Sequence, residues 1–149
     1  MQELLAPELV CFYSKEWHWL GSNYTLAPII SKVAGISIDA ITLPIPFEFY
    51  SIAQRMSWAS RRETTRLEDT AYCLMGIFDV NMPLLYGEGE KAFQRLQEEI
   101  MKASYDHSLF AWRLLTPCEQ YGQALGLLAP SPAEFQYSSH YRSRSEAQD

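Results

Sequence analysis

The spacing of apolar residues along the middle of the chain constrains the fold more than any other feature. Between Thr25 and Gly35 these residues fall at i, i+3, i+4, i+7 and i+8, which predicts a helix capped by Thr25 and ended by Gly35. The same period predicts helices over about 51–60, 65–78 and 88–103. This amount of amphipathic helix predicts a fold dominated by helices.

Local signals set the expected ends and surface pairs of these helices. Ser37 is placed to cap a short turn that ends near Ile41. Thr65 and Glu68 have the spacing of a capping box, in which each side chain binds a backbone N–H of the first turn. On the last helix, opposite charges four residues apart predict two ion pairs, Arg95–Glu99 and Glu98–Lys102.

A smaller β component precedes the helices. Residues 9–14 and 17–21 are typical of strands, and the two-residue connection between them predicts a hairpin. Residues 108–112 are compatible with a further short strand, and 126–129 form an apolar run that we expect to be buried. We therefore predict an α+β fold that is predominantly α-helical, with four to five helices and a small β-hairpin.

The two ends of the chain differ from its middle. Pro7 ends a helical turn that occupies the first residues. Ser131 is placed to cap a turn over 132–135. The polar residues 137–149 have no periodicity, which predicts a disordered tail.

Composition excludes several functional classes. The 149 residues include 48% hydrophobic residues, enough for a core, and a net charge of −6 argues against nucleic-acid or anionic-membrane binding. No apolar run approaches the ~20 residues needed to span a bilayer. Aromatic residues make up 13% of the chain, so either the core is unusually aromatic or some rings face a partner.

Cysteine and histidine residues do not have the spacing of a metal site. Three cysteines lie far apart and never in a C-x-x-C pair, so we expect buried free thiols in a reducing cytosol: Cys11, Cys73 and Cys118. The histidines, His18, His107 and His140, are equally scattered. The Gly87–Gly89 segment carries acids beside its amides, which disfavours nucleotide binding by that loop.

Two groups of side chains are candidates for an interface. Tryptophans supply the first group, in which Trp17 and Trp19 point to one face of a strand and either pack in the core or dock a partner, and Trp58 is a third candidate. The second group is a basic island with a single acid among its arginines: Arg55, Arg61, Arg62 and Arg66. These arginines either bridge acids of neighbouring helices or bind an anion or a partner domain.

A long stretch of the chain resembles a known family. The residues RMSWASRRETTRLEDTAYCLMGIFDV, at 55–80, and MPLLYGEG, at 82–89, closely resemble fungal heterokaryon-incompatibility (HET) domain proteins. The resemblance continues through 92–100, 108–112 and 126–132 and covers about 130 residues. Of the motifs at the end of the HET core, only the junction QELLAP, at 2–7, is present. We therefore expect the region C-terminal to the HET core of an N-terminally truncated protein.

The resemblance implies a domain organisation and a role. It implies a remnant of the HET core at 1–8, a helical HET-associated domain at 9–136 and the disordered tail at 137–149. Members of this family act in non-self recognition and programmed cell death. The chain would then be a non-catalytic, cytoplasmic accessory region without a cofactor, which packs on a HET/TIR-like core and on attached sensor domains or proteins. Uncovered docking surfaces would also favour self-association.

The same resemblance implies an alternative. The HET core is similar to TIR domains, some of which cleave NAD with a helix-borne glutamate, and Glu3 would match that catalytic residue. NAD would be the substrate of a full-length protein, with the four arginines of the basic island near a phosphate. For the chain alone we expect no NAD turnover, because the loops that would hold a nucleotide are absent from it.

Overall fold

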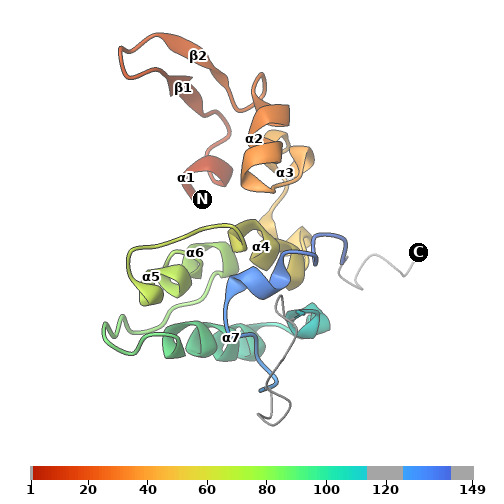
Figure 1. Cartoon of the computed structure of the whole chain (residues 1–149). Helices are drawn as coiled ribbons and strands as arrows, with labels where there is room; N and C mark the ends of the chain where they lie inside the picture. The colour runs from red at the N-terminus through yellow and green to blue at the C-terminus, as the bar shows by residue number, and fades with distance from the viewer. Residues whose placement is uncertain (1, 114–125, 142–149) are drawn as a thin grey trace, which may run out of the picture. The chain divides into compact units, whose positions relative to one another are not determined.

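The computed structural model describes residues 2–113 and 126–141, which divide into two compact units. Unit 1 is Met1–Pro46 and unit 2 is Phe47–Asp149. The fold is α+β and dominated by helices, with one two-stranded antiparallel hairpin, as predicted (Figure 1). The division at Pro46 was not anticipated from the sequence. None of the helices in the described residues has the length and apolar character to cross a membrane.

Unit 1 consists of the hairpin and three short helices. Its elements are α1 (Gln2–Leu5), β1 (Cys11–Tyr13), β2 (Trp19–Ser22), α2 (Ala27–Ala34) and α3 (Ile38–Thr42). The strands pair with Cys11 opposite Ser22 and Tyr13 opposite Trp19, and an irregularity between Phe12 and Tyr13 shifts the register. The hairpin is therefore confirmed, but its turn is longer than the predicted two residues.

The start of α2 differs from the prediction, and its end agrees. Thr25 does not cap the helix, because its Oγ1 accepts a hydrogen bond from Ser22 N at 2.8 Å and closes the turn after β2. Gly35 ends α2 with a φ of 70°, a left-handed conformation that glycine adopts without a side-chain clash. Ser37 caps α3 as predicted, accepting a hydrogen bond from Ala40 N.

A buried polar side chain joins the segments of unit 1. Asn23 is 1% exposed and donates from Nδ2 to Ile41 O at 3.1 Å and to Glu8 O at 3.2 Å. Its Oδ1 accepts from Val10 N at 3.1 Å. Unit 1 thus buries a few small or medium side chains around a hydrogen-bonded amide, and it leaves most of its large apolar residues outside.

Unit 2 is built around α4 (Ile52–Ala59), a helix buried on almost every side. The 3-10 helices η2 (His107–Phe110) and η3 (Pro132–Phe135) pack against it. The remaining elements are η1 (Phe47–Phe49), α5 (Leu67–Tyr72), α6 (Met75–Phe78) and α7 (Lys91–Ala103), of which α5 packs on α7 (Figure 1). Ser51 begins α4 with the capping box that it forms with Gln54. The core includes Met56, Leu74, Leu96 and Phe135, each fully buried.

The predicted helix over 65–78 is two helices, and the capping box at Thr65 is wrong. Arg66 is the N-cap residue of α5 and makes no side-chain capping bond. Glu68, the other half of the expected box, turns inward instead and binds amides of a distant loop. The helix is interrupted between α5 and α6, and Asp79 ends α6 with a φ of 51°.

The predicted strand at 108–112 is also wrong, because Asp106 starts a 3-10 helix there. Its Oδ1 accepts from Ser108 N and its Oδ2 accepts from Ile52 N, both at 2.9 Å. One carboxylate thereby caps η2 and contacts the first turn of α4. The sequence signal for this cap is a single aspartate, which the strand-like pattern of the following residues obscures.

The first part of the predicted disordered tail is packed. Ser138 is 2% exposed and donates from Oγ to Ala111 O at 2.6 Å, while Ser51 Oγ donates to Tyr141 O. Disorder is therefore wrong for 137–141, and residues 142–149 lie outside the described part. Ser131 caps η3 as predicted. Cys11 and Cys73 are free but exposed rather than buried, and Cys118 lies outside the described residues.

Candidate docking surfaces

The tryptophans separate into one core residue and two exposed ones. Trp58 is 3% exposed and packs edge-on against Phe47 and Tyr50, so it is a core residue and not an interface residue. Trp17 and Trp19 are 81% and 62% exposed. Core packing is therefore wrong for these two, and they do not share a strand, because Trp17 lies in the turn with a φ of 63°.

Other large apolar residues of unit 1 are exposed as well. On α2, Ile29 and Val33 lie one helical turn apart and are 62% and 75% exposed, although their spacing is that of a buried stripe. Leu9 and Leu20 of the hairpin region are more than half exposed. Neighbouring exposed apolar side chains, such as Ile29 and Val33, mark surfaces that bind other proteins or membranes.

The arginines of the basic island do not form one surface. Arg61, Arg62 and Arg66 are exposed in the segment between α4 and α5. Arg55 is 9% exposed inside unit 2, where its Nη1 donates to Ile77 O at 3.1 Å. Arg66 places its guanidinium 5.1 Å from the centre of the Tyr86 ring, a cation–π contact rather than the expected bridge to an acid.

A loop formed by residues 83–89 is hydrogen-bonded to a carboxylate of α5. Glu68 is 7% exposed, and its Oε1 accepts from Gly87 N at 2.7 Å and from Gly89 N at 3.0 Å. Both glycines have positive φ, 100° and 61°, which other residues adopt only with strain. Backbone N–H groups of Glu68 itself, Gly89 and Gly87 lower the pKa of the Glu68 carboxyl. The amides of Gly87 and Gly89 are thus occupied by Glu68.

A second set of contacts fixes the same loop from α5 and α7. Tyr72 donates from its hydroxyl to Glu88 Oε1 at 3.0 Å and accepts from Leu85 N at 2.8 Å. Arg95 pairs with Glu88 and donates from Nη2 to Pro83 O at 2.8 Å. The pKa of Glu88 is lowered, chiefly by its bond from Arg95, and desolvation raises the pKa of Tyr72. Arg95 therefore binds the loop and not Glu99, its predicted partner, and Lys102 pairs with Glu99 rather than with Glu98.

The side chains on the outer side of this loop are apolar and exposed. Leu84, Leu85 and Tyr86 are 55%, 52% and 54% exposed, and Leu67 at the start of α5 is 61% exposed. Tyr86 is oriented by its hydroxyl, which donates to Asp69 Oδ1 at 3.0 Å. The backbone of the 83–89 loop is thus fixed while its apolar side chains face solvent. A surface ordered in advance loses less conformational entropy when a partner binds.

The hydrogen bonds that Glu68 accepts from Gly87 and Gly89 should help to order the 83–89 loop, and this contribution can be tested. We expect Glu68→Gln to speed amide exchange at Gly87 and Gly89 about tenfold, because a neutral amide oxygen accepts hydrogen bonds more weakly than a carboxylate. A lowered folded-state pKa means that the stabilisation is complete above the unfolded pKa of about 4.3 and is lost as pH falls below it. The wild-type chain should therefore lose more stability between pH 6 and pH 3.5 than the variant does.

Hydrogen exchange followed by NMR and urea unfolding at the two pH values measure these effects. Glu98→Gln on the outer face of α7 is the matched control, since it removes the same charge from an exposed residue. Equal exchange rates at both glycines in wild type and Glu68→Gln would show that the carboxylate does not hold the loop.

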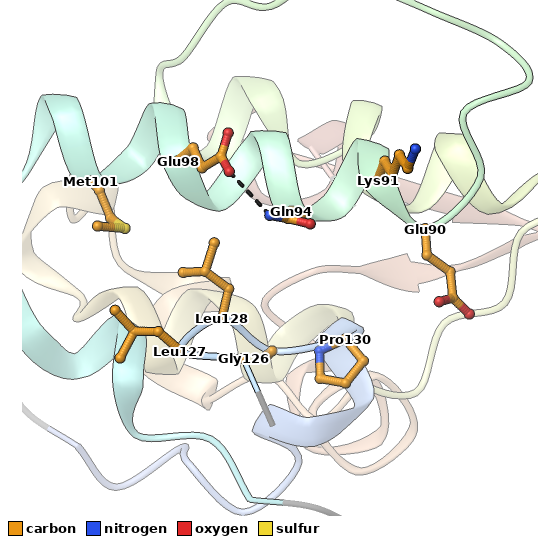
Figure 2. Close-up of a pocket in the computed structure, with 10 residues that line it drawn as sticks. Glu90, Lys91, Gln94, Glu98, Met101, Gly126, Leu127, Leu128 and Pro130 are labelled. Atoms are coloured by element: carbon orange, nitrogen blue, oxygen red, sulfur yellow. Dashed lines mark hydrogen bonds between the residues drawn. The ribbon is translucent and has the colours of Figure 1, made fainter. Parts of the chain in front are cut away.

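A groove of about 520 Å³ runs along α7 in unit 2, between this helix and residues 126–130. Figure 2 shows Glu98, Gln94 and Glu90 along the α7 side of the groove and Leu127, Leu128 and Pro130 along the other side, with Gln94 donating to Glu98 at 3.2 Å. The segment 126–130 on the other side of the groove is fixed to α7 by Gln97, which is fully buried and hydrogen-bonds to both backbone groups of Ala129. Leu127 is 66% exposed, so the expected burial of 126–129 holds for Ala129 but not for Leu127.

Glu3, the candidate catalytic residue, is exposed on the four-residue helix α1. A cavity of about 90 Å³ lies nearby in unit 1, lined by residues 5–8, Tyr24 and 40–44, and Glu3 does not line it. Within the described residues, no cluster of three or more His, Cys, Asp or Glu side chains could hold a metal ion. The contacts of Glu68 with the 83–89 loop are not predicted by the sequence, in which their signal is a glutamate on α5 together with two distant glycines.

Comparison with known proteins gives two matches. A family model described as a domain of unknown function, DUF8212, matches residues 91–146. The chain is also similar to the vegetative incompatibility protein HET-E-1 of Podospora anserina, at 48% identity over 103 residues. That match covers 68% of this chain but only 8% of HET-E-1. No solved structure matches the chain. The similarity to HET-E-1 supports a relationship to the heterokaryon incompatibility family.

Proposed function

We propose that this chain is a non-catalytic accessory region of a fungal heterokaryon incompatibility protein, acting in the cytoplasm in non-self recognition that ends in programmed cell death. It docks on a HET/TIR-like core and passes to that core the state of attached sensor domains or proteins. The similarity to HET-E-1 supports the biological process. The observation that carries the docking role is the exposure of Trp17, Trp19, Ile29 and Val33 in unit 1.

Exposure of these apolar side chains to water is unfavourable. Apolar surface gains about 25 cal/mol per Å² when it leaves water, so large side chains held outside a core favour contact with a partner. Trp17 is also held at a left-handed φ, which is strained for a bulky residue and is typical of functional positions. Tyrosine and tryptophan contribute more than most residues to the binding energy of interfaces. The same residues favour self-association when no partner is present.

The 83–89 loop of unit 2 supplies a second docking surface in this proposal. Its ordered backbone presents Leu84, Leu85 and Tyr86, and Arg66 lies against the Tyr86 ring. Two separate surfaces suit an accessory region that contacts both a core and a sensor.

Replacing the exposed tryptophans tests the proposal. We expect the double variant Trp17→Ser, Trp19→Ser to abolish the incompatibility reaction when it is built into the complete protein, because the substitutions remove both indole rings from the proposed interface. In the isolated chain the same changes should reduce the binding of a hydrophobic dye and self-association, with stability changed by less than about 0.5 kcal/mol per exposed site. Cell-death assays, dye fluorescence and light scattering measure these outcomes.

Tyr105→Ser is the control. Tyr105 is 98% exposed in unit 2, so this substitution removes an exposed aromatic ring that is not part of the proposed docking surface. A double tryptophan variant that gives a normal incompatibility reaction at normal protein level would rule out docking through these residues.

Measuring NAD consumption in cells that express the complete protein distinguishes the alternative, in which the longer protein cleaves NAD with Glu3 as the catalytic residue. If the chain only docks, Glu3→Ala leaves NAD consumption in cells unchanged. Loss of NAD consumption in Glu3→Ala, with association of the chain intact, would favour the enzyme instead.

A further inference from the structure

A cavity of about 270 Å³ lies within unit 2, separate from the surfaces described above. Three carboxylates, one guanidinium and apolar side chains line it, including Arg55, Glu48, Asp79, Asp106, Phe78 and Ile100. Its volume is just below the range of about 300–1,000 Å³ typical of small-molecule sites. The cavity therefore suits a ligand the size of a single amino acid.

Arg55 is an incompletely paired cation in the wall of this cavity. It is 9% exposed, its guanidinium lies 4.7 Å from the centre of the Phe78 ring, and Nη1 donates to Ile77 O at 3.1 Å. Its Nε is buried without a hydrogen-bond acceptor among the described residues. Arginine has five N–H donors, and buried donors nearly always have partners. Because Arg55 also lines the cavity, its guanidinium is placed to pair with an acidic group of a ligand, and the solvent-inaccessible Nε is not the contacting atom.

The other charges around the cavity favour a positive group. Glu48, Asp79 and Asp106 outnumber the one guanidinium, and Asp106 already accepts two backbone N–H bonds. Ala103 and Ser104, at the C-terminal end of α7, also line the cavity. The carbonyl groups at such an end carry partial negative charge. A ligand bound here therefore needs a cationic group as well as an acceptor oxygen.

We propose that this cavity binds a free α-amino acid, whose carboxylate pairs with Arg55 and whose ammonium group lies between Glu48 and Asp79. The apolar wall at Ile100 accepts an apolar side chain. The N-terminus of a peptide shares the ammonium group and the adjacent carbonyl oxygen, so it is the other source of the same chemistry. This site is independent of the docking role proposed above and involves none of its residues.

Titration of the isotope-labelled chain with three related probes tests the site. We expect leucine to cause saturable shifts in the NMR amide signals of Asp79 and Ser104. N-acetyl-leucine lacks the ammonium group and should bind at least about tenfold more weakly, as expected for loss of one charge-assisted contact. Leucinamide separates the sources: weaker binding than leucine supports a free amino acid, and equal or tighter binding supports a peptide N-terminus.

Charge-neutralising variants locate the site. Asp79→Asn and Glu48→Gln should each weaken leucine about tenfold. Both residues are exposed, and asparagine tolerates the left-handed backbone of Asp79, so neither change should disturb folding. Glu63→Gln removes the same charge from an exposed residue after α4 and should leave binding unchanged. Absence of saturable shifts with both leucine and leucinamide, or equal weakening by all three variants, would overturn the proposal.

Discussion

Replacing Gln97 with leucine is expected to lower the free energy of unfolding of unit 2 by about 2–6 kcal/mol. Gln97 is fully buried, accepts from Ala129 N at 3.0 Å and donates from Nε2 to Ala129 O at 2.9 Å. Leucine fills a similar volume but leaves both backbone groups buried without a partner. Each unpaired buried group costs about 1–3 kcal/mol, which sets the size of the effect.

Urea unfolding followed by circular dichroism measures this loss. Gln94→Leu is the matched control, because Gln94 lies on the same helix but is exposed. It should change stability by no more than about 0.5 kcal/mol. If the two variants unfold at the same urea concentration, the pairing of α7 with residue 129 does not stabilise the unit.

The second large effect is expected for Phe135→Ala, which should destabilise unit 2 by about 3–5 kcal/mol. Phe135 is fully buried in η3, which packs on the central helix α4. Removing the ring deletes its transfer free energy and leaves a cavity that a short 3-10 helix cannot close. Total stabilities are only about 5–15 kcal/mol, so this one change should come close to unfolding the unit.

Thermal and urea unfolding measure the effect of Phe135→Ala. Tyr137→Ala, two residues later and 63% exposed, removes an aromatic ring without emptying the core and should be nearly neutral. An unchanged midpoint for Phe135→Ala would mean that η3 is not part of the cooperative core. The family model matches residues 91–146, but α4, on which the Phe135 helix packs, lies before that range. A large loss of stability would therefore mean that the matched region needs α4 to complete its core.

Much of the fold was predictable because it depends on local signals. The helices around Met56 and Leu96 follow from apolar spacing, and Gly35 and Ser131 act at the predicted ends. These features need only the residues within a turn or two of one another. The hairpin belongs to the same class, although its turn includes Trp17 in an unusual conformation.

The candidate docking surfaces were predictable only in part. Trp17 and Trp19 were recognised as candidates, but alternation along a strand does not tell a core face from an outer one. Proximity in sequence groups Arg55 with Arg61 and Arg62, yet a helix carries Arg55 inward while the following segment leaves the others exposed.

The contacts of Glu68 illustrate why the remaining features needed the tertiary structure. By sequence it is an acid in the first turn of a helix, three residues after a threonine, which is the pattern of a capping box. In the folded chain its carboxylate binds two amides about twenty residues away and leaves the helix start uncapped. Two backbone donors on the glycine-containing 83–89 loop satisfy the carboxylate better than one local bond, and no local pattern encodes that choice.

By itself the sequence determined the helix-dominated class, most helix positions and the resemblance to incompatibility proteins, because hydrophobic period, caps and motifs are properties of neighbouring residues. Only the tertiary structure decided which apolar side chains stay outside, since burial depends on what the rest of the chain can cover. It placed Trp58 in the core and Trp17 in solvent, and it buried Arg55 beside a cavity. Those placements depend on packing between distant segments, where hydrogen-bond satisfaction and available volume, rather than spacing, select the outcome.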